Sequence, residues 1–218
     1  MTIVAIDGPV GSGKSSVARL AAERLGYLYL DTGAMYRAVG LLATEEGISL
    51  DDEEAVAAVA ASANLRFSGG RLMAGSRDVS EAIRTLEMGA AASRVSALPG
   101  VRRLLVERQR ELGNGADIVM EGRDIGTNVF PDAAVKIFLT ARPEVRAARR
   151  ALELQGNGEE VDQPAVLAAL IERDRRDTER AIAPLRKAPD AVEIDSSDMT
   201  LEEVVAAVVA VVRKGDRA

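Results

Sequence analysis

Residues 3 to 16 read IVAIDGPVGSGKSS, and this stretch decides the fold. Gly8, Gly13, Lys14 and Ser15 have the spacing GxxxxGK(S/T), after a strand-like apolar run and before a helical pattern. Glycines let backbone amides approach phosphate oxygens, and the helix start adds the positive end of its dipole. A turn that binds nothing is the alternative, but the context favours a loop for the phosphates of a nucleoside triphosphate. The residues expected to contact ATP are Gly8, Pro9, Val10, Gly11, Ser12, Gly13, Lys14, Ser15 and Ser16.

Four further apolar runs have the length of strands buried on both faces of a sheet. With the first, the five runs are Thr2 to Ile6, Tyr27 to Leu30, Ile118 to Met120, Ala134 to Leu139 and Ala191 to Ile194. Helical patterns lie between them. This alternation predicts the α/β class, with a five-stranded parallel sheet wrapped by helices.

Two of the helices carry end signals. Gly26 stands where the first helix needs a C-terminal cap. The last helix, residues 201–213, follows Thr200, has Glu203 at capping-box spacing, and is expected to end before Gly215.

Two stretches depart from this rhythm. Residues 49–96 contain a short acidic helix and then two strand-like runs around Gly69 and Gly70, which predicts a hairpin. We interpret them as an insert in a single domain, 1–218, whose core is 1–48 and 97–218. The polar segment QGNGEEVD, residues 155–162, predicts a mobile loop, and we expect a lid over about residues 155–180.

Composition excludes several kinds of chemistry. The chain has no cysteine and no histidine, so thiolate nucleophiles, imidazole bases and zinc sites built from these residues are impossible. The net charge of -6 gives no general attraction to nucleic acid. No apolar run is long enough to span a membrane, and no signal peptide is recognisable. We therefore expect a cytoplasmic monomer that acts on small molecules, without nucleic acid or membrane partners.

The phosphate loop identifies a nucleotide and not a reaction. A GTPase would need a base-reading NKxD segment, which the sequence lacks. Two segments follow strand ends and carry arginine, LDTGAMYR with Arg37 and MEGRDIGT with Arg123. Ligands bind at this edge of an open parallel sheet. Together with the phosphate loop, these segments closely resemble the bacterial cytidylate kinase family, and SRVSALPGVRRLLVERQR and ERDRRDTERAIAPL extend the resemblance over nearly the whole chain.

The resemblance implies a P-loop kinase fold with a small monophosphate-binding insert and a helical lid. It implies transfer of the γ-phosphoryl group of ATP, with Mg2+, to CMP or dCMP. By position, Arg37, Arg123 and Arg173 would bind the acceptor phosphate, Ser93, Arg102 and Asp124 the cytosine, and Asp177 the ribose. Thr32 and Tyr36 would lie in the same acceptor pocket, and Arg176 and Arg180 would be lid arginines. Ser15 would bind Mg2+ directly and Glu121 through water.

The pattern of residues supports this interpretation independently. Arg173, Arg176, Asp177 and Arg180 are spaced i, i+3, i+4 and i+7, so we expect them on one helix face. A solvated, salt-bridged face is the alternative. We expect Lys14, Arg123 and the arginines of this helix to be catalytic, because an ionised acceptor phosphate needs charge neutralisation and no general base. A regulatory nucleotide-binding module and a hydroxyl-phosphorylating kinase of shikimate type are the other functions considered.

Overall fold

The computed structural model describes residues 1–156 and 160–215. The chain divides into two compact units, one made of Met1–Tyr29 with Ala116–Ala218 and the other of Leu30–Gly115. The predicted insert, residues 49–96, falls within the second unit.

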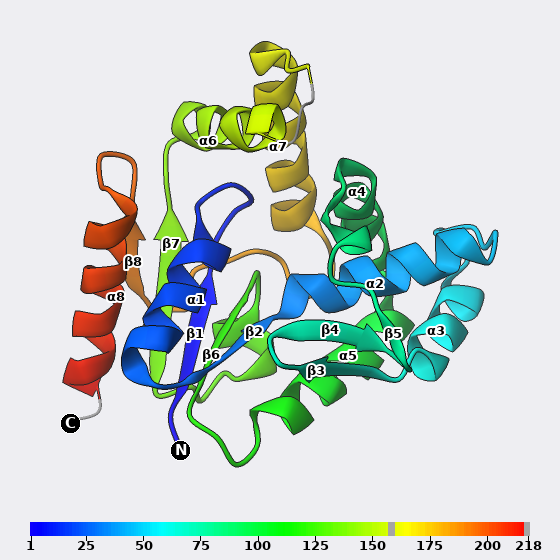
Figure 1. The fold of residues 1–218 in the computed structure, drawn as a ribbon, viewed down its shortest axis with the longest axis horizontal. Helices are drawn as coiled ribbons and strands as arrows, with labels where there is room; N and C mark the ends of the chain where they lie inside the picture. The colour runs from blue at the N-terminus through cyan, green and yellow to red at the C-terminus, as the bar shows by residue number, and fades with distance from the viewer. Residues whose placement is uncertain (157–159, 216–218) are drawn as a thin grey trace. The chain divides into compact units, whose positions relative to one another are not determined.

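The first unit is built on a five-stranded parallel sheet with the strand order β2-β6-β1-β7-β8 (Figure 1). The strands are β1 (Ile3–Asp7), β2 (Leu28–Asp31), β6 (Ile118–Gly122), β7 (Val135–Thr140) and β8 (Val192–Asp195). Strand β2 begins in this unit and ends in the second. The predicted sheet is confirmed, each observed strand lying within two residues of the expected run. Because β1 pairs with both β6 and β7, its last residue lies beside the end of β6.

Helices follow the strands as the sequence predicts. The helices of this unit are α1 (Lys14–Leu25), α6 (Pro143–Gly156), α7 (Gln163–Glu179), α8 (Leu201–Gly215) and the one-turn π-helix η2 (Ile125–Val129). Gly26 caps α1 in the left-handed conformation, as expected. The Glu203 carboxylate accepts from the Thr200 amide at 2.8 Å, so the capping box of α8 is confirmed. The expected end of this helix was wrong, since α8 includes Gly215.

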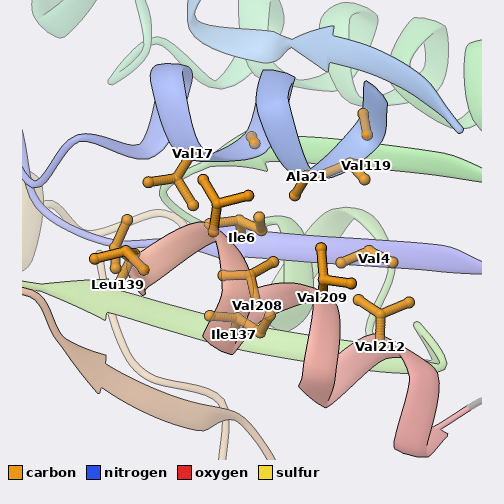
Figure 2. Close-up of a cluster of buried hydrophobic side chains, with 14 of the residues drawn as sticks. Val4, Ile6, Val17, Ala21, Val119, Ile137, Leu139, Val208, Val209 and Val212 are labelled. Carbon is orange, nitrogen blue, oxygen red and sulfur yellow. The ribbon is translucent and has the colours of Figure 1, made fainter. Parts of the chain in front are cut away.

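One apolar cluster joins the sheet to α1 and α8 (Figure 2). Ile6 of β1 and Leu139 of β7 meet Val17 of α1 and Val208 of α8 in this cluster. Each large aliphatic side chain buried there contributes roughly 1.5–3 kcal/mol by leaving water. This core holds the carboxyl end of β1, where the phosphate loop begins, beside β7.

The second unit combines helices with a small antiparallel sheet. Its elements are α2 (Thr32–Glu45), α3 (Glu53–Ser62), β3 (Leu65–Ser68), β4 (Arg71–Ala74), β5 (Arg77–Asp78), η1 (Ala82–Arg84), α4 (Leu86–Val95) and α5 (Pro99–Gly113). The acidic helix is α3, and Gly69 and Gly70 join β3 to β4 with φ of 55° and 77°. Both features of the insert were predicted correctly. Helix α2 packs on α4, and α3 packs on α5.

The lid region is described in part. Helix α6 ends at Gly156 and α7 begins at Gln163. The centre of the loop predicted at 155–162, residues 157–159, lies outside the described residues. No helix among the described residues is long and apolar enough to cross a membrane.

Candidate active site

The phosphate loop connects the end of β1 to the start of α1. Gly8 has φ of 154°, and a Cβ atom there would lie 2.0 Å from the carbonyl oxygen of Leu139. Only glycine fits this approach to the neighbouring strand. At the other end of the loop, Gly13 is the N-cap of α1, and Ser15 and Ser16 are exposed in the first helical turn. The backbone amides of a helix start in this position can bind an anion.

Lys14 is buried beneath this loop, with 5% of its surface exposed. Its ammonium group donates to the carbonyl oxygen of Pro9 at 2.6 Å and to the hydroxyl of Ser12 at 3.3 Å. Burial lowers the pKa of Lys14 to about 7, and the Arg123 guanidinium adds to this effect, while Glu121 acts against it. An anion close to Lys14 would reverse these influences, because it stabilises the charged form.

The segment after β6 meets the end of α7 in two ion pairs. Arg123 Nε donates to Asp177 Oδ2 at 3.0 Å, and Arg180 Nη2 donates to Asp124 Oδ1 at 3.3 Å. Burial would raise the pKa of Asp177, but Arg123 and Arg173 outweigh it and hold this pKa below its ordinary value. Four residues predicted from separate motifs therefore lie together.

Two further arginines of the predicted lid lie on α7. Arg173 acts electrostatically on both Lys14 and Asp177, so it belongs to the same charged group. Arg176 is exposed and lies 3.6 Å from the Glu172 carboxylate. The expectation that all four spaced residues share one helix face was wrong for Arg180. Helix α7 ends at Glu179, and Arg180 is its C-cap, with φ of -58° and ψ of 139° and with its Nε donating to the carbonyl of Ala183 at 2.6 Å.

The residues proposed for Mg2+ are Ser15 and Glu121. The Glu121 carboxylate is buried in β6 and accepts the Tyr29 hydroxyl at 2.7 Å. Among residues 1–156 and 160–215, no group of three or more acidic side chains could hold a metal ion alone. A hydroxyl and a carboxylate are hard oxygen ligands that suit Mg2+ when a nucleotide and water supply the remaining oxygens.

The other candidate residues lie in the second unit, near the start of α2 and on α4 and α5. Arg37 Nη2 pairs with Asp31 Oδ2 at 2.6 Å, and the other carboxylate oxygen of Asp31 accepts the Ala34 amide at 3.0 Å and caps α2. The Arg102 guanidinium is buried and lies over the Tyr36 ring, 5.8 Å from its centroid. Thr32 is buried in the first turn of α2, and Ser93 is half-buried in α4. The candidate residues are thus divided between the two units.

Sequence reasoning missed several residues that support the site in the first unit. Arg146 of α6, 4% exposed, donates through Nη1 to the Val10 carbonyl at 2.9 Å and to Asp174 Oδ2 at 2.6 Å. It therefore joins the phosphate loop to α7. Asp7 binds the amides of Ile125 and Gly126. Asp7 could have been noticed in the sequence as a charged residue at the end of a buried strand. No feature of the neighbouring sequence distinguishes Arg146.

Comparison with known proteins identifies the family. The cytidylate kinase family model matches residues 4–214. The cytidylate kinase of Solibacter usitatus is 46% identical over 97% of this chain and 92% of its own length. That of Geobacter sp. (strain M21) is 49% identical over 93% of this chain and 89% of its own. A gluconokinase structure from Sinorhizobium meliloti covers 99% of this chain and 94% of its own at 18% identity and a TM-score of 0.52, which shows the fold alone. The chain therefore belongs to the cytidylate kinase family, and it is an ATP-dependent nucleoside monophosphate kinase.

Proposed function

We propose that this enzyme transfers the γ-phosphoryl group of ATP to CMP or dCMP, giving ADP and CDP or dCDP. The observation that carries the chemistry is the charged group of the first unit, in which Arg123 and Arg173 both act on Lys14. Converging cations beside a phosphate loop suit a reaction that brings phosphates together. The base assignment is supported by the similarity to cytidylate kinases, which are 46% and 49% identical over 97% and 93% of this chain.

Catalysis is alignment and charge stabilisation. The acceptor phosphate oxygen is already ionised near neutral pH, so it attacks the γ-phosphorus without giving a proton to the protein. The ADP oxygen leaves in line with the attack. The phosphate loop and Lys14 hold the triphosphate, Arg123 and Arg173 bind the acceptor phosphate, and Arg176 and Arg180 neutralise charge on the transferring group. The absence of histidine from the whole sequence is consistent with a reaction that needs no general base.

Mg2+ fits the oxygen ligands described above; Ser15 would bind it directly and Glu121 through water. When bound, the ion would offset the negative charge of the β- and γ-phosphates.

The base and ribose of the acceptor are assigned to further residues. We assign Ser93, Arg102 and Asp124 to the cytosine and Asp177 to the ribose. Arg37 is assigned to the acceptor phosphate, with Arg123 and Arg173, and Thr32 and Tyr36 to the same acceptor pocket. Cytosine presents an amino donor beside a ring acceptor, which suits a carboxylate together with a guanidinium. Uracil presents the opposite pattern, so CMP is preferred to UMP. We also propose residues 49–96 as the monophosphate-binding insert and about 155–180 as the lid. Action as a monomer in the cytoplasm stays a prediction.

The test is an enzyme-coupled assay of ADP release with purified protein and Mg-ATP, across CMP, dCMP, UMP, AMP and shikimate. We expect turnover with CMP and dCMP, weaker use of UMP and none with shikimate. Lys14→Ala should abolish turnover, which excludes a contaminating kinase. Equal use of UMP and CMP would refute the base assignment. Turnover with no acceptor except shikimate would refute transfer to a phosphate.

A further inference from the structure

Asp7, the last residue of β1, is a buried carboxylate to which the mechanism above gives no task. Only 5% of its surface is exposed. Its Oδ1 accepts the Ile125 amide at 2.8 Å, and its Oδ2 accepts the Gly126 amide at 2.7 Å. Each carboxylate oxygen thus holds one of two successive peptide groups in the segment after β6.

These two amides come directly after Arg123 and Asp124. On the other side of that pair, Gly122 lies opposite Asp7 in the register of β1 and β6. The pair is therefore fixed between a sheet residue and two peptide groups that bind the same aspartate. The segment packs closely at Gly126, where an added Cβ atom would lie 3.2 Å from the Lys136 side chain.

We propose that Asp7 helps to position the acceptor nucleotide: the Asp7 carboxylate fixes the backbone that orients Arg123 and Asp124. The contacts of both side chains depend on that backbone, since Arg123 pairs with Asp177 and Asp124 with Arg180. This inference rests on the proposed function, in which Arg123 binds the acceptor phosphate and Asp124 the cytosine.

The chemistry of the contact explains why the residue is aspartate. Each of the two amides donates to its own carboxylate oxygen, whereas asparagine would offer one oxygen and an NH2 group that cannot accept. Burial raises the pKa of Asp7 to about 6, and the nearby Asp124 charge adds to this, whereas the Gly126 and Ile125 amides and Lys14 lower it. The carboxylate is therefore largely ionised at neutral pH, and both oxygens can accept.

The experiment compares Asp7→Asn with Asp117→Asn. Asp117 makes a matched control because it precedes β6 and its carboxylate accepts the Thr2 amide before β1, at 2.5 Å. The same substitution is thus made at opposite ends of the same two strands, and no candidate site residue adjoins Asp117. The measurements are steady-state kinetics with CMP and UMP, calorimetric binding of ATP without acceptor, and amide hydrogen exchange of peptides covering residues 123–129.

In Asp7→Asn we expect kcat/KM for CMP to fall about 10- to 100-fold, since one buried amide loses its acceptor. The preference for CMP over UMP should weaken, and exchange at 123–129 should become faster. The ATP dissociation constant should change by a smaller factor than kcat/KM for CMP, because the hydrogen bond lost belongs to the acceptor side and only the charge of Asp7 acts on Lys14. Asp117→Asn should match the wild type in every measurement.

Wild-type kinetics or unchanged exchange in a folded Asp7→Asn would overturn the proposal. An equal loss of ATP and CMP binding, with faster exchange throughout the first unit, would also overturn it, because that result describes a general structural role. If Asp7→Asn does not fold, Asp7→Glu decides, since it keeps both oxygens but displaces them by a methylene group. The proposal then requires selective loss of CMP use, and wild-type kinetics or failure to fold in Asp7→Glu would overturn it.

The proposed function fails separately, through absence of CMP turnover in the wild type. In that case the exchange data alone decide whether Asp7 fixes the segment.

Discussion

Binding of ATP is expected to draw a proton onto Lys14. Burial lowers the pKa of Lys14 to about 7 in the unliganded protein, with Arg123 as the next cause. About half of these side chains are then neutral at pH 7, about a tenth at pH 6 and about nine-tenths at pH 8. A bound triphosphate favours the charged ammonium and raises this pKa again, so the neutral fraction takes up protons on binding.

The assay is isothermal titration calorimetry of Mg-ATP in buffers that differ in ionisation enthalpy, at pH 6, 7 and 8. The slope of observed enthalpy against buffer ionisation enthalpy counts the protons taken from the buffer. We expect about 0.1, 0.5 and 0.9 protons per site at the three pH values. Lys14→Arg is the matched control, because a guanidinium stays charged throughout this range and should contribute no uptake. Lys14→Met provides a second control without a titrating group.

Two results would refute the reasoning. One is a slope that is near zero at pH 8 or that falls as the pH rises. The other is a slope in the wild type that equals the slopes in Lys14→Arg and Lys14→Met, since the proton would then come from another group.

Three further substitutions test other parts of the site. Arg146→Met leaves the Asp174 charge without its partner and should destabilise the protein by about 3–5 kcal/mol in urea unfolding. Adding Asp174→Asn to the same chain should recover part of that loss. Additive effects of the two substitutions would mean that the pair is not coupled. Gly8→Ala should lower stability by at least about 3 kcal/mol in thermal unfolding, because its Cβ would collide with backbone, and a smaller loss would mean that the loop moves freely. Arg176→Ala should lower kcat by roughly a thousandfold. Its neighbour Arg175 is exposed and paired with carboxylates on its own helix, so Arg175→Ala serves as the control and should change kcat by less than about twofold. If the two substitutions lowered kcat equally, Arg176 would have no specific role in catalysis.

Local interactions explain what could be predicted from the sequence. The spacing from Gly8 to Ser15 predicts the phosphate loop because its characteristic residues all lie within eight consecutive positions. The cap at Gly26 and the capping box at Thr200 also join residues at most four positions apart. Alternating apolar runs and helical patterns then suffice for a parallel sheet, since such strands need helical crossovers. The same motifs made the family recognisable.

The end of α7 shows where spacing alone fails. The pattern of Arg173, Arg176, Asp177 and Arg180 is that of a helix face, but the helix stops at Glu179. The amide of Leu185 binds the carbonyl of Asp177 at 2.8 Å, and Arg180 binds Ala183 and Asp124. These contacts compete with a further helical turn, and the periodicity of the sequence does not predict them.

The sequence by itself therefore determined the sheet, the phosphate loop and the identity of the charged residues that serve it. Only the tertiary structure decided how those residues are held and what their protonation is. Asp7 reaches amides 118 and 119 residues away, and Arg146 reaches a loop carbonyl 136 residues away. The lowered pKa of Lys14 arises from burial and from charges brought near it by folding. Hydrogen bonds and desolvation act over a few ångströms of space, and distance along the chain does not determine which groups come that close.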